Sequence, residues 1–210
     1  MSPATGRTGT GERMIRLKYG NTNTYLIPAC AGYLLVDTDY AGTLPALYRA
    51  LKQNGVMVRD IGWVMATHYH PDHMGLIPDL MAQGVKLLLI DAQLGSVHFA
   101  DRIFARDGLP FRPIDEARAA VIRCADSRAF LHELGIAGEI VSTPSHSADS
   151  VSLILDSGDC FVGDMEPLSY LDAYPEKCPL RDDWDKVLRH RPKRILYAHA
   201  NETALEGGAL

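Results

Sequence analysis

Hydrophobic residues along the chain form short runs that alternate with segments of helical spacing. Continuous apolar runs such as 61–66 and 85–90 are typical of strands buried on both faces of a sheet. Leu44, Leu47 and Leu51 recur at helical spacing before Gly55, which predicts a helix. The whole pattern predicts strands at 14–19, 24–28, 33–36, 61–66, 85–90, 139–142, 151–155, 160–162 and 194–198, and helices at 43–54, 74–83, 127–134 and 181–190.

These elements predict an α/β protein in which two sheets pack together with helices outside, because strands and interspersed helices occur in both halves of the chain. A length of 210 residues suits a single domain, which we expect over 14–210. Residues 1–13 predict a flexible leader, so Met14 could be the natural start. Residues 91–118 mix Phe and Arg with Gly and Pro, which indicates an insertion, either a lid over the substrate or a small satellite core.

The composition excludes several classes of protein. A chain that is 47% hydrophobic and 22% charged can form a sizeable core, and its net charge of −5 argues against binding to nucleic acid. No apolar run approaches the roughly 20 residues of a membrane span, and the N-terminus does not resemble a secretory signal. The 4 cysteines are scattered without a CxxC pair, which is typical of a reduced, cytoplasmic protein.

Histidine supplies the most specific signal. His68, His70 and His73 fall in the single stretch HYHPDH, directly after the predicted strand 61–66. Side chains two apart on an extended backbone point to the same side, so His68 and His70 can bind one ion together. Asp72 and His73, beyond the intervening proline, can face a second ion. Imidazole and carboxylate groups are the usual ligands of catalytic zinc, which keeps one position open for water.

Four further polar residues follow predicted strands. Loops at strand ends are places where a rigid scaffold holds functional side chains, and ligands delivered from several strand ends to one edge suit a two-metal site. Taken singly, a residue of this kind is more often an ordinary buried or loop residue than a ligand. We interpret His98, His132 and His190, which follow no such pattern, as ordinary surface or helix residues. The four residues are Asp37 after 33–36, His146 after 139–142, Asp164 after 160–162 and His199 after 194–198.

The histidine-rich stretch resembles the HxHxDH signature of the metallo-β-lactamase fold superfamily. The resemblance continues in order through five motifs that span Asp37 to His199, which is most of the chain. Five motifs in order, each at a predicted strand end, are far more specific than one. They read LLVDT at Asp37, THYHPDH from His68 to His73, TPSH at His146, FVGD at Asp164 and LYAHA at His199.

The resemblance implies a four-layer αββα sandwich of two mixed β-sheets, with helices on the outer faces. It also implies a dinuclear metal site with roles for specific residues. His68, His70 and His146 would bind the first ion, and Asp72, His73 and His199 would bind the second. Asp164 would bridge the two ions. Asp37 would orient the ligands without binding an ion itself. Asp164 would fix the pair of ions, and Asp72 would orient the reactants or accept a proton.

These features together predict a hydrolase that uses two zinc ions to make hydroxide available near neutral pH, acting on a small ester, thioester, lactone or related bond. Iron or manganese could replace zinc. A mononuclear iron enzyme similar to the persulfide dioxygenases of the same fold is the main alternative, followed by a phosphodiesterase or a non-catalytic metal-binding protein. We expect a small-molecule substrate, no nucleic acid or membrane partner, and possibly a homodimer.

Some residues depart from the family's pattern or lie near its site without an assigned role. Asp39 follows the first motif, Ser145 precedes His146, and Ala198 and Ala200 flank His199, where Gly is frequent in the family. None of these departures removes a ligand. Between the fourth and fifth motifs, four residues could reach the mouth of the site, namely Tyr170, Tyr174, Lys177 and Arg181.

Overall fold

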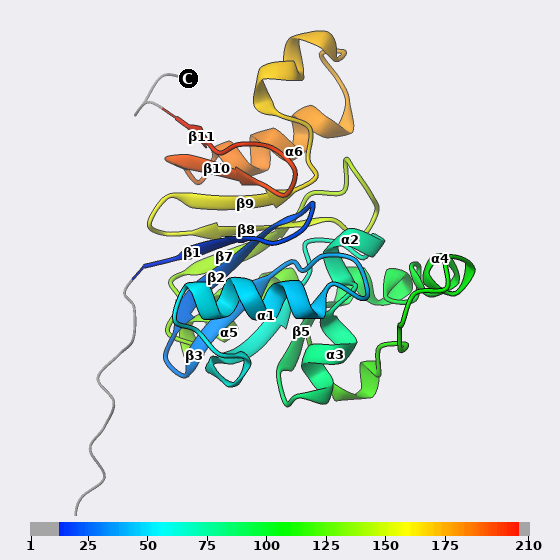
Figure 1. The fold of residues 1–210 in the computed structure, drawn as a ribbon. Coiled ribbons are helices and arrows are strands. Elements are labelled where there is room, and N and C mark those ends of the chain that lie inside the picture. Colours follow the sequence, from blue (N-terminus) through cyan, green and yellow to red (C-terminus); the bar gives the residue numbers. More distant parts are fainter. Residues whose placement is uncertain (1–12, 206–210) are drawn as a thin grey trace, which may run out of the picture.

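The strands of the protein form two mixed sheets in the computed structural model, which describes residues 13–205 (Figure 1). In the first sheet β1 to β3 are antiparallel, and β3 to β6 are parallel. Its strands lie in chain order: β1 (Ile15–Lys18), β2 (Asn23–Ala29), β3 (Gly32–Val36), β4 (Ile61–Met65), β5 (Lys86–Ile90) and β6 (Ala119–Ile122).

The second sheet is built from the C-terminal part of the chain. The pair β9 and β10 is parallel, and the other neighbours are antiparallel. Its strands lie in the order β11 (Thr203–Ala204), β10 (Arg194–Tyr197), β9 (Asp159–Gly163), β8 (Val151–Leu155) and β7 (Gly138–Ser142). The helices are α1 (Leu44–Gln53), α2 (Pro71–Met74), α3 (Ile77–Ala82), α4 (Asp101–Arg106), α5 (Ser127–Glu133) and α6 (Pro179–Leu188).

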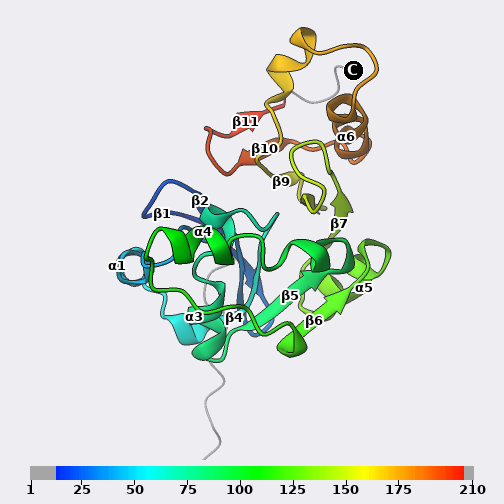
Figure 2. The ribbon, with the colours of Figure 1, turned by 90° about the vertical axis from the view of Figure 1, so that its right-hand side faces the viewer.

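Alternating side chains divide the core into three apolar layers. On β5, Leu87 and Leu89 pack with residues of α1 and α3, whereas Leu88 and Ile90 face the second sheet. A third cluster joins the outer face of the second sheet to Trp184 and its neighbours on α6. Figures 1 and 2 show α6 at one end of this stack and α1 and α3 at the other. The predicted αββα sandwich is therefore confirmed.

The topology brings one end of each sheet to a common edge. Strands β3, β4 and β5 run parallel, so their carboxyl ends lie side by side. Strand β7 is antiparallel to β8, which is antiparallel to β9, so β7 runs in the same direction as β9 and β10. The loops that follow these strands carry every candidate residue of the site.

The structure differs from the sequence prediction around the histidine-rich stretch. The predicted helix 74–83 is two short helices, because α2 begins at Pro71 and Gly75 separates it from α3. Asp72 and His73 therefore lie on a helical turn. Proline suits the first turn of a helix, where no intrahelical bond is lost. The same preference starts α6 at Pro179, two residues before the predicted position.

Strand β6 was not predicted, because its sequence Ala-Ala-Val-Ile is short and shows no alternation. In the preceding segment 91–118, Phe104 is fully buried against the first core cluster, whereas Phe99 is 55% exposed. The interpretation of 91–118 as an insertion stays a prediction. Residues 1–12 of the predicted leader lie outside the described residues. Within 13–205, the structure contains no helix of sufficient length and apolar character to cross a bilayer.

Candidate metal centre

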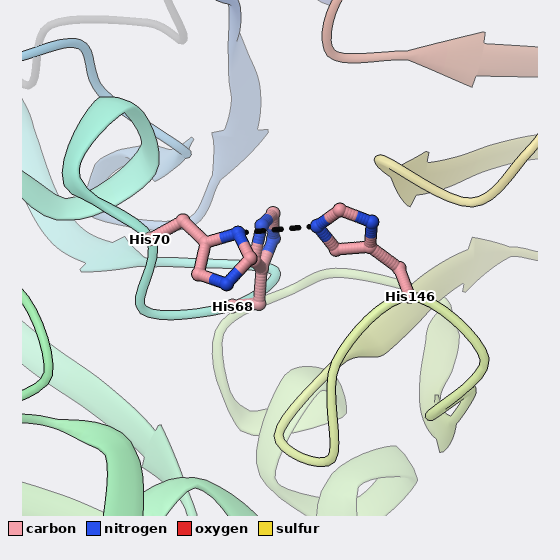
Figure 3. A group of neighbouring side chains, drawn as sticks. All are labelled: His68, His70 and His146. Carbon is pink, nitrogen blue, oxygen red and sulfur yellow. Dashed lines mark hydrogen bonds between the residues drawn. The ribbon is translucent and has the colours of Figure 1, made fainter.

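Histidine and aspartate side chains from both sheets converge at the common edge. These side chains form groups in which the donor atoms lie within 4.8 Å of one another. The first histidine group consists of His68, His70 and His146. Figure 3 shows these three rings facing one another across the gap between the loops after β4 and β7, with Nδ1 of His70 3.1 Å from Nε2 of His146. The other groups are His68, His73 and Asp164, and Asp72, His73 and His199.

Asp164 lies between the two sets of histidines. Its Oδ2 is 3.8 Å from Nε2 of His68 and 3.7 Å from Nε2 of His146. Its Oδ1 is 3.3 Å from Nε2 of His73 and 3.3 Å from Nε2 of His199. The two oxygens of one carboxylate therefore face two separate groups of imidazole nitrogens.

The second histidine group consists of Asp72, His73 and His199. Nε2 of His199 lies 3.1 Å from Oδ2 of Asp72 and 3.3 Å from Nε2 of His73. Because Asp72 and His73 are adjacent on α2, whereas His199 follows β10, this group also joins the two sheets.

A chain of hydrogen bonds determines which nitrogen of His68 faces the centre. The Thr67 hydroxyl lies 3.0 Å from Oδ2 of Asp37, to which it donates its only proton. It can therefore only accept at Nδ1 of His68, 3.3 Å away, which makes Nδ1 the protonated nitrogen. The lone pair on Nε2 then faces Asp164. Burial, followed by the neighbouring His73, lowers the pKa of His68 and keeps its ring neutral.

Asp37 also acts on the second group. Its Oδ2 lies 3.2 Å from Nδ1 of His73, and its backbone φ of 59° is in the left-handed region, where Asp is tolerated better than most residues. Burial alone would favour the neutral ring of His73, but the carboxylates of Asp37 and Asp164 raise its pKa to about 10. The surroundings of His73 therefore favour positive charge.

The carboxylates of the centre remain ionised. Burial alone would raise the pKa of Asp164, but the close contact of its Oδ1 with His73 and the charge of that ring hold the pKa below its usual value. Burial also acts on Asp72, where the hydrogen bond from His199 and the charge of His73 together outweigh it and lower the pKa. The site therefore combines anionic oxygens with imidazole lone pairs, which is the chemistry that divalent transition metals prefer.

The burial and spacing of the donor atoms suit a bound metal ion better than hydrogen bonds among the donors themselves. Nε2 of His68 and Oδ1 of Asp164 are buried without a hydrogen-bond partner among the described residues, although buried polar atoms are normally paired. Two ligands about 2.0–2.1 Å from a tetrahedral ion lie roughly 3.3 Å apart. The separations of 3.1 Å for His70–His146 and 3.3 Å for His73–His199 are close to that value.

Comparison with known proteins agrees with the fold. Residues 17–199 match the family described as Metallo-beta-lactamase superfamily. The chain belongs to this superfamily. A beta-lactamase-like protein 2 homolog of Drosophila melanogaster is 28% identical over 86% of the chain, and a lactamase-like protein of Emericella nidulans, aptB, is 29% identical over 75%. The chain spans 59% and 46% of the lengths of these relatives.

Solved structures of the superfamily share the fold at low sequence identity. A metallo-beta-lactamase family protein from Thermus thermophilus superposes with a TM-score of 0.65 at 21% identity, covering 91% of this chain and 74% of that one. The B3 metallo-beta-lactamase BLEG-1 gives a TM-score of 0.66 at 17% identity, covering 91% and 94%. TTHA1623, solved in a di-iron-bound form, gives 0.60 at 22% identity, covering 90% and 93%.

Residues that the sequence analysis missed fix the superfamily motifs in place. The hairpin between β1 and β2 holds the loop of His199, because the side-chain amide of Asn23 donates to the carbonyls of Tyr197 and Ala200, each at 3.0 Å. The carbonyl of Asn21 lies 3.3 Å from Nδ1 of His199. These partners are more than 170 residues apart, so no local signal reveals them.

The loop that carries His146 is held from two sides. Asp149, within the loop, accepts a hydrogen bond from the backbone amide of Tyr69 at 2.7 Å, and the buried Gln93 donates to the carbonyls of Ala66 and Asp149. On the other side, Asp183 of α6 accepts from the amide of Ser145 at 2.7 Å. Both sheets of this superfamily member therefore contribute to the position of His146.

The four residues expected near the mouth of the site differ in their surroundings. The Arg181 guanidinium donates hydrogen bonds to the backbone carbonyls of Leu171 and Tyr174, so its donor groups are engaged by the protein's own backbone. The Tyr174 side chain lines a cavity beside His146, and Tyr170 is exposed. Lys177 is also exposed. On the other side of His146, the ring of Phe99 lies 5.2 Å from that of His70.

Proposed function

We propose that this chain is a metal-dependent hydrolase with two divalent ions, zinc in the first instance, and a small-molecule substrate. The observation that carries the proposal is the position of Asp164, whose two oxygens face two separate histidine groups at 3.3–3.8 Å. A single carboxylate between two groups of imidazole and carboxylate donors is suited to contact a pair of cations.

The proposed ligands follow from the grouping of donors. His68, His70 and His146 would hold the first ion, and Asp72, His73 and His199 the second. Asp164, which contacts both groups, would contribute to both sites. Asp37 orients His73 directly and His68 through the Thr67 hydroxyl. Such outer partners fix the tautomer and direction of a ligand, which strengthens its bond to the metal.

Bound divalent ions supply Lewis acidity, which makes hydroxide available near neutral pH and polarises the bond that is to be cleaved. The protein's own residues provide the remaining functions. Asp164 keeps the two histidine groups in a fixed relative position. Asp72, ionised and 20% exposed at its side chain, can accept a proton from a reacting group or orient it. The ring of Phe99, tilted against that of His70 at 5.2 Å between centroids, adds an apolar wall beside the centre.

The proposed substrate is a small molecule with an ester, thioester, lactone or related bond. The chemistry needs no serine or cysteine nucleophile, and the donor groups contain none. The superfamily's scaffold supports many reactions, so the substrate depends on the walls of the site rather than on the fold. We also propose a cytoplasmic location, in agreement with the absence of disulfides among the 4 cysteines, all of which are free.

Elemental analysis of protein purified without chelator tests the proposal first. We expect about two zinc ions per chain, and hydrolysis of at least one class in a panel of esters, thioesters and lactones. His70→Ala and Asp164→Ala should each abolish turnover while the fold is retained by circular dichroism. His132→Ala is the matched control, because His132 is an exposed histidine of α5 outside the donor groups. Full turnover in either ligand variant would refute the proposal.

Iron is the second candidate metal, because TTHA1623, which shares the fold, is described in a di-iron-bound form. The same elemental analysis distinguishes the two. About one iron per chain, with oxygen uptake in the presence of a persulfide, would assign the dioxygenase-like chemistry instead of hydrolysis.

A further inference from the structure

Helix α6 holds several loops around the first histidine group through the polar side chains of one short segment. Its Asp183 accepts from the amide of Ser145 at 2.7 Å, and its Lys186 donates to the carbonyl of Ser142 at 3.0 Å. Trp184 donates from Nε1 to the carbonyl of Glu166 at 3.0 Å. The side chains of α6 thus bind the loop after β7 and the segment after β9.

The same helix also holds the segment that follows Glu166. The Arg181 guanidinium donates to three carbonyls of that segment, those of Leu171 at 2.6 Å, Pro175 at 2.8 Å and Tyr174 at 3.1 Å. Because one helix binds every wall segment, the walls keep a fixed relative position. Preorganised walls of this kind are typical of a binding site, since little ordering is needed when a ligand enters.

These walls line an open pocket of about 200 Å³ directly beside the metal centre. Its lining residues are Ser145, His146, Glu166, Tyr174 and Leu180. His146 belongs to the first donor group as well, so anything bound in the cavity lies next to that group. A cavity of this size exceeds what a single water molecule requires and suits a small substituent.

The polar groups of the cavity lack partners. The Ser145 hydroxyl is buried without a hydrogen bond among the described residues, which is uncommon for a buried polar atom. Glu166 and Tyr174 are exposed, and neither the Tyr174 hydroxyl nor the Glu166 carboxylate has a hydrogen bond or ion pair within 13–205. Glu166 is the one carboxylate among the lining residues.

We propose that this cavity is a substrate subsite for a small substituent that ends in a hydrogen-bond donor, with a primary ammonium as the preferred group. The Glu166 carboxylate binds the positive charge, and the Ser145 and Tyr174 hydroxyls accept hydrogen bonds from it. The proposal rests on the proposed hydrolase function and adds the class of substrate, namely a small ester or thioester that carries an amine beside the bond that is cleaved. Ser145, where the family often has Gly, becomes a specificity-determining residue.

Matched substrates test the subsite in the zinc-loaded enzyme. One series varies the acyl group among 3-ammoniopropanoyl, 3-hydroxypropanoyl and butanoyl, and a second series places the same end groups on the leaving group. We expect kcat/KM to favour ammonium over methyl by about tenfold or more in one series, with hydroxyl between them. Glu166→Gln and Ser145→Ala should each reduce that ratio at least threefold. Glu176→Gln, an exposed carboxylate outside the lining, should leave the ratio unchanged.

A binding measurement separates this proposal from the proposed function. Saturation-transfer NMR with propylammonium, propanol and propanoate should show a signal for propylammonium that falls in Glu166→Gln and Ser145→Ala but not in Glu176→Gln. If no ester is cleaved but propylammonium binds in this way, the hydrolase function fails and the subsite stands. If hydrolysis shows no preference for ammonium in either series, or the ratio does not change in the two lining variants, the subsite is refuted while the hydrolase function stands.

Discussion

Asp37 accepts two hydrogen bonds from Thr67, one from the backbone amide at 2.6 Å and one from the hydroxyl at 3.0 Å to its other oxygen. This contact joins the carboxyl ends of β3 and β4, so the loop that begins with His68 starts from a fixed position. Because the hydroxyl also contacts Nδ1 of His68, the same contact determines the ring's tautomer. A threonine outside the donor groups thus controls a proposed ligand.

Replacing Thr67 by Val tests this control. Valine retains the shape of the side chain and removes the hydroxyl, so Nδ1 of His68 loses its partner. We expect zinc affinity to fall about 10- to 100-fold, the usual effect of losing an outer partner of a ligand. Competition with a chromophoric chelator measures the affinity. Thr67→Ser restores the hydroxyl and should restore most of the affinity; equal affinities in the two variants would show that the hydroxyl has no such role.

Gly163, immediately before Asp164, should not tolerate a side chain. Its φ is +58°, and a Cβ there would lie 2.5 Å from Oγ1 of Thr67. We expect Gly163→Ala to lower the free energy of unfolding by more than about 2 kcal/mol and to weaken metal binding. Gly55→Ala is the control, because Gly55 has a φ of +70° but open space around it. Its cost should be about 1 kcal/mol, without loss of metal; urea unfolding gives both values.

Asp183 should affect the first histidine group without being a ligand. Asp183→Ala removes the acceptor for the Ser145 amide and leaves Lys186 with the Ser142 carbonyl but without its carboxylate partner, so we expect a loss of about 1–3 kcal/mol in stability. The visible spectrum of the cobalt-substituted protein should change, because the loop of His146 loses its support. Asp183→Asn keeps an acceptor oxygen and should retain most of the wild-type spectrum. Identical spectra in Ala and wild type would contradict the prediction.

Burial between the sheets should determine how much a truncation costs. Leu88 is fully buried there, and truncation to Ala should cost about 2–5 kcal/mol through lost contacts and the cavity that remains. Val121, on edge strand β6, is 44% exposed, and its change to Ala should cost less than about 1 kcal/mol. Chemical denaturation midpoints compare the two directly. A similar cost at both positions would mean that packing between the sheets contributes no more to stability than an exposed edge position does.

Metal removal should destabilise the folded protein. A ligand that binds only the folded state at 100 times its dissociation constant adds about 2.7 kcal/mol, so zinc should raise the thermal midpoint and EDTA should lower it. Asp164→Ala should lose this response, whereas His132→Ala should respond as the wild type does. A zinc response in the Asp164 variant as large as that of the wild type would argue against the bridging role.

The sequence predicts the fold well because apolar runs mark the strands locally. Polar residues after the strand ends, such as His68 and His199, lie at the common edge as expected, but their assignment as metal ligands comes from the family resemblance and stays a prediction. The short strand β6 escaped detection because Ala119 and Ala120 carry little apolar area and show no alternation. Asp72 and His73 were expected beyond a turn, but Pro71 starts a helix there.

The supporting residues could not be predicted from the same signals. Asn23 contacts the carbonyl of Tyr197, 174 positions away, and Asp183 contacts the amide of Ser145, 38 positions away. Such partners become adjacent only when the two sheets pack. A buried Asn or Asp is a strong sign of a structural role in a folded protein, yet in the sequence it cannot be distinguished from an exposed one.

Each of the two proposed ligand sets draws on both layers of the sandwich, with His68 and His70 opposite His146, and Asp72 and His73 opposite His199. If the sheets separate even briefly, both sets come apart together. Metal bound at the proposed centre would therefore cross-link the layers, and hydrogen exchange at the amides of β4 and β9 should slow in parallel when metal is added. The edge that carries the proposed centre would then also make the two halves of the molecule open and close as one cooperative unit.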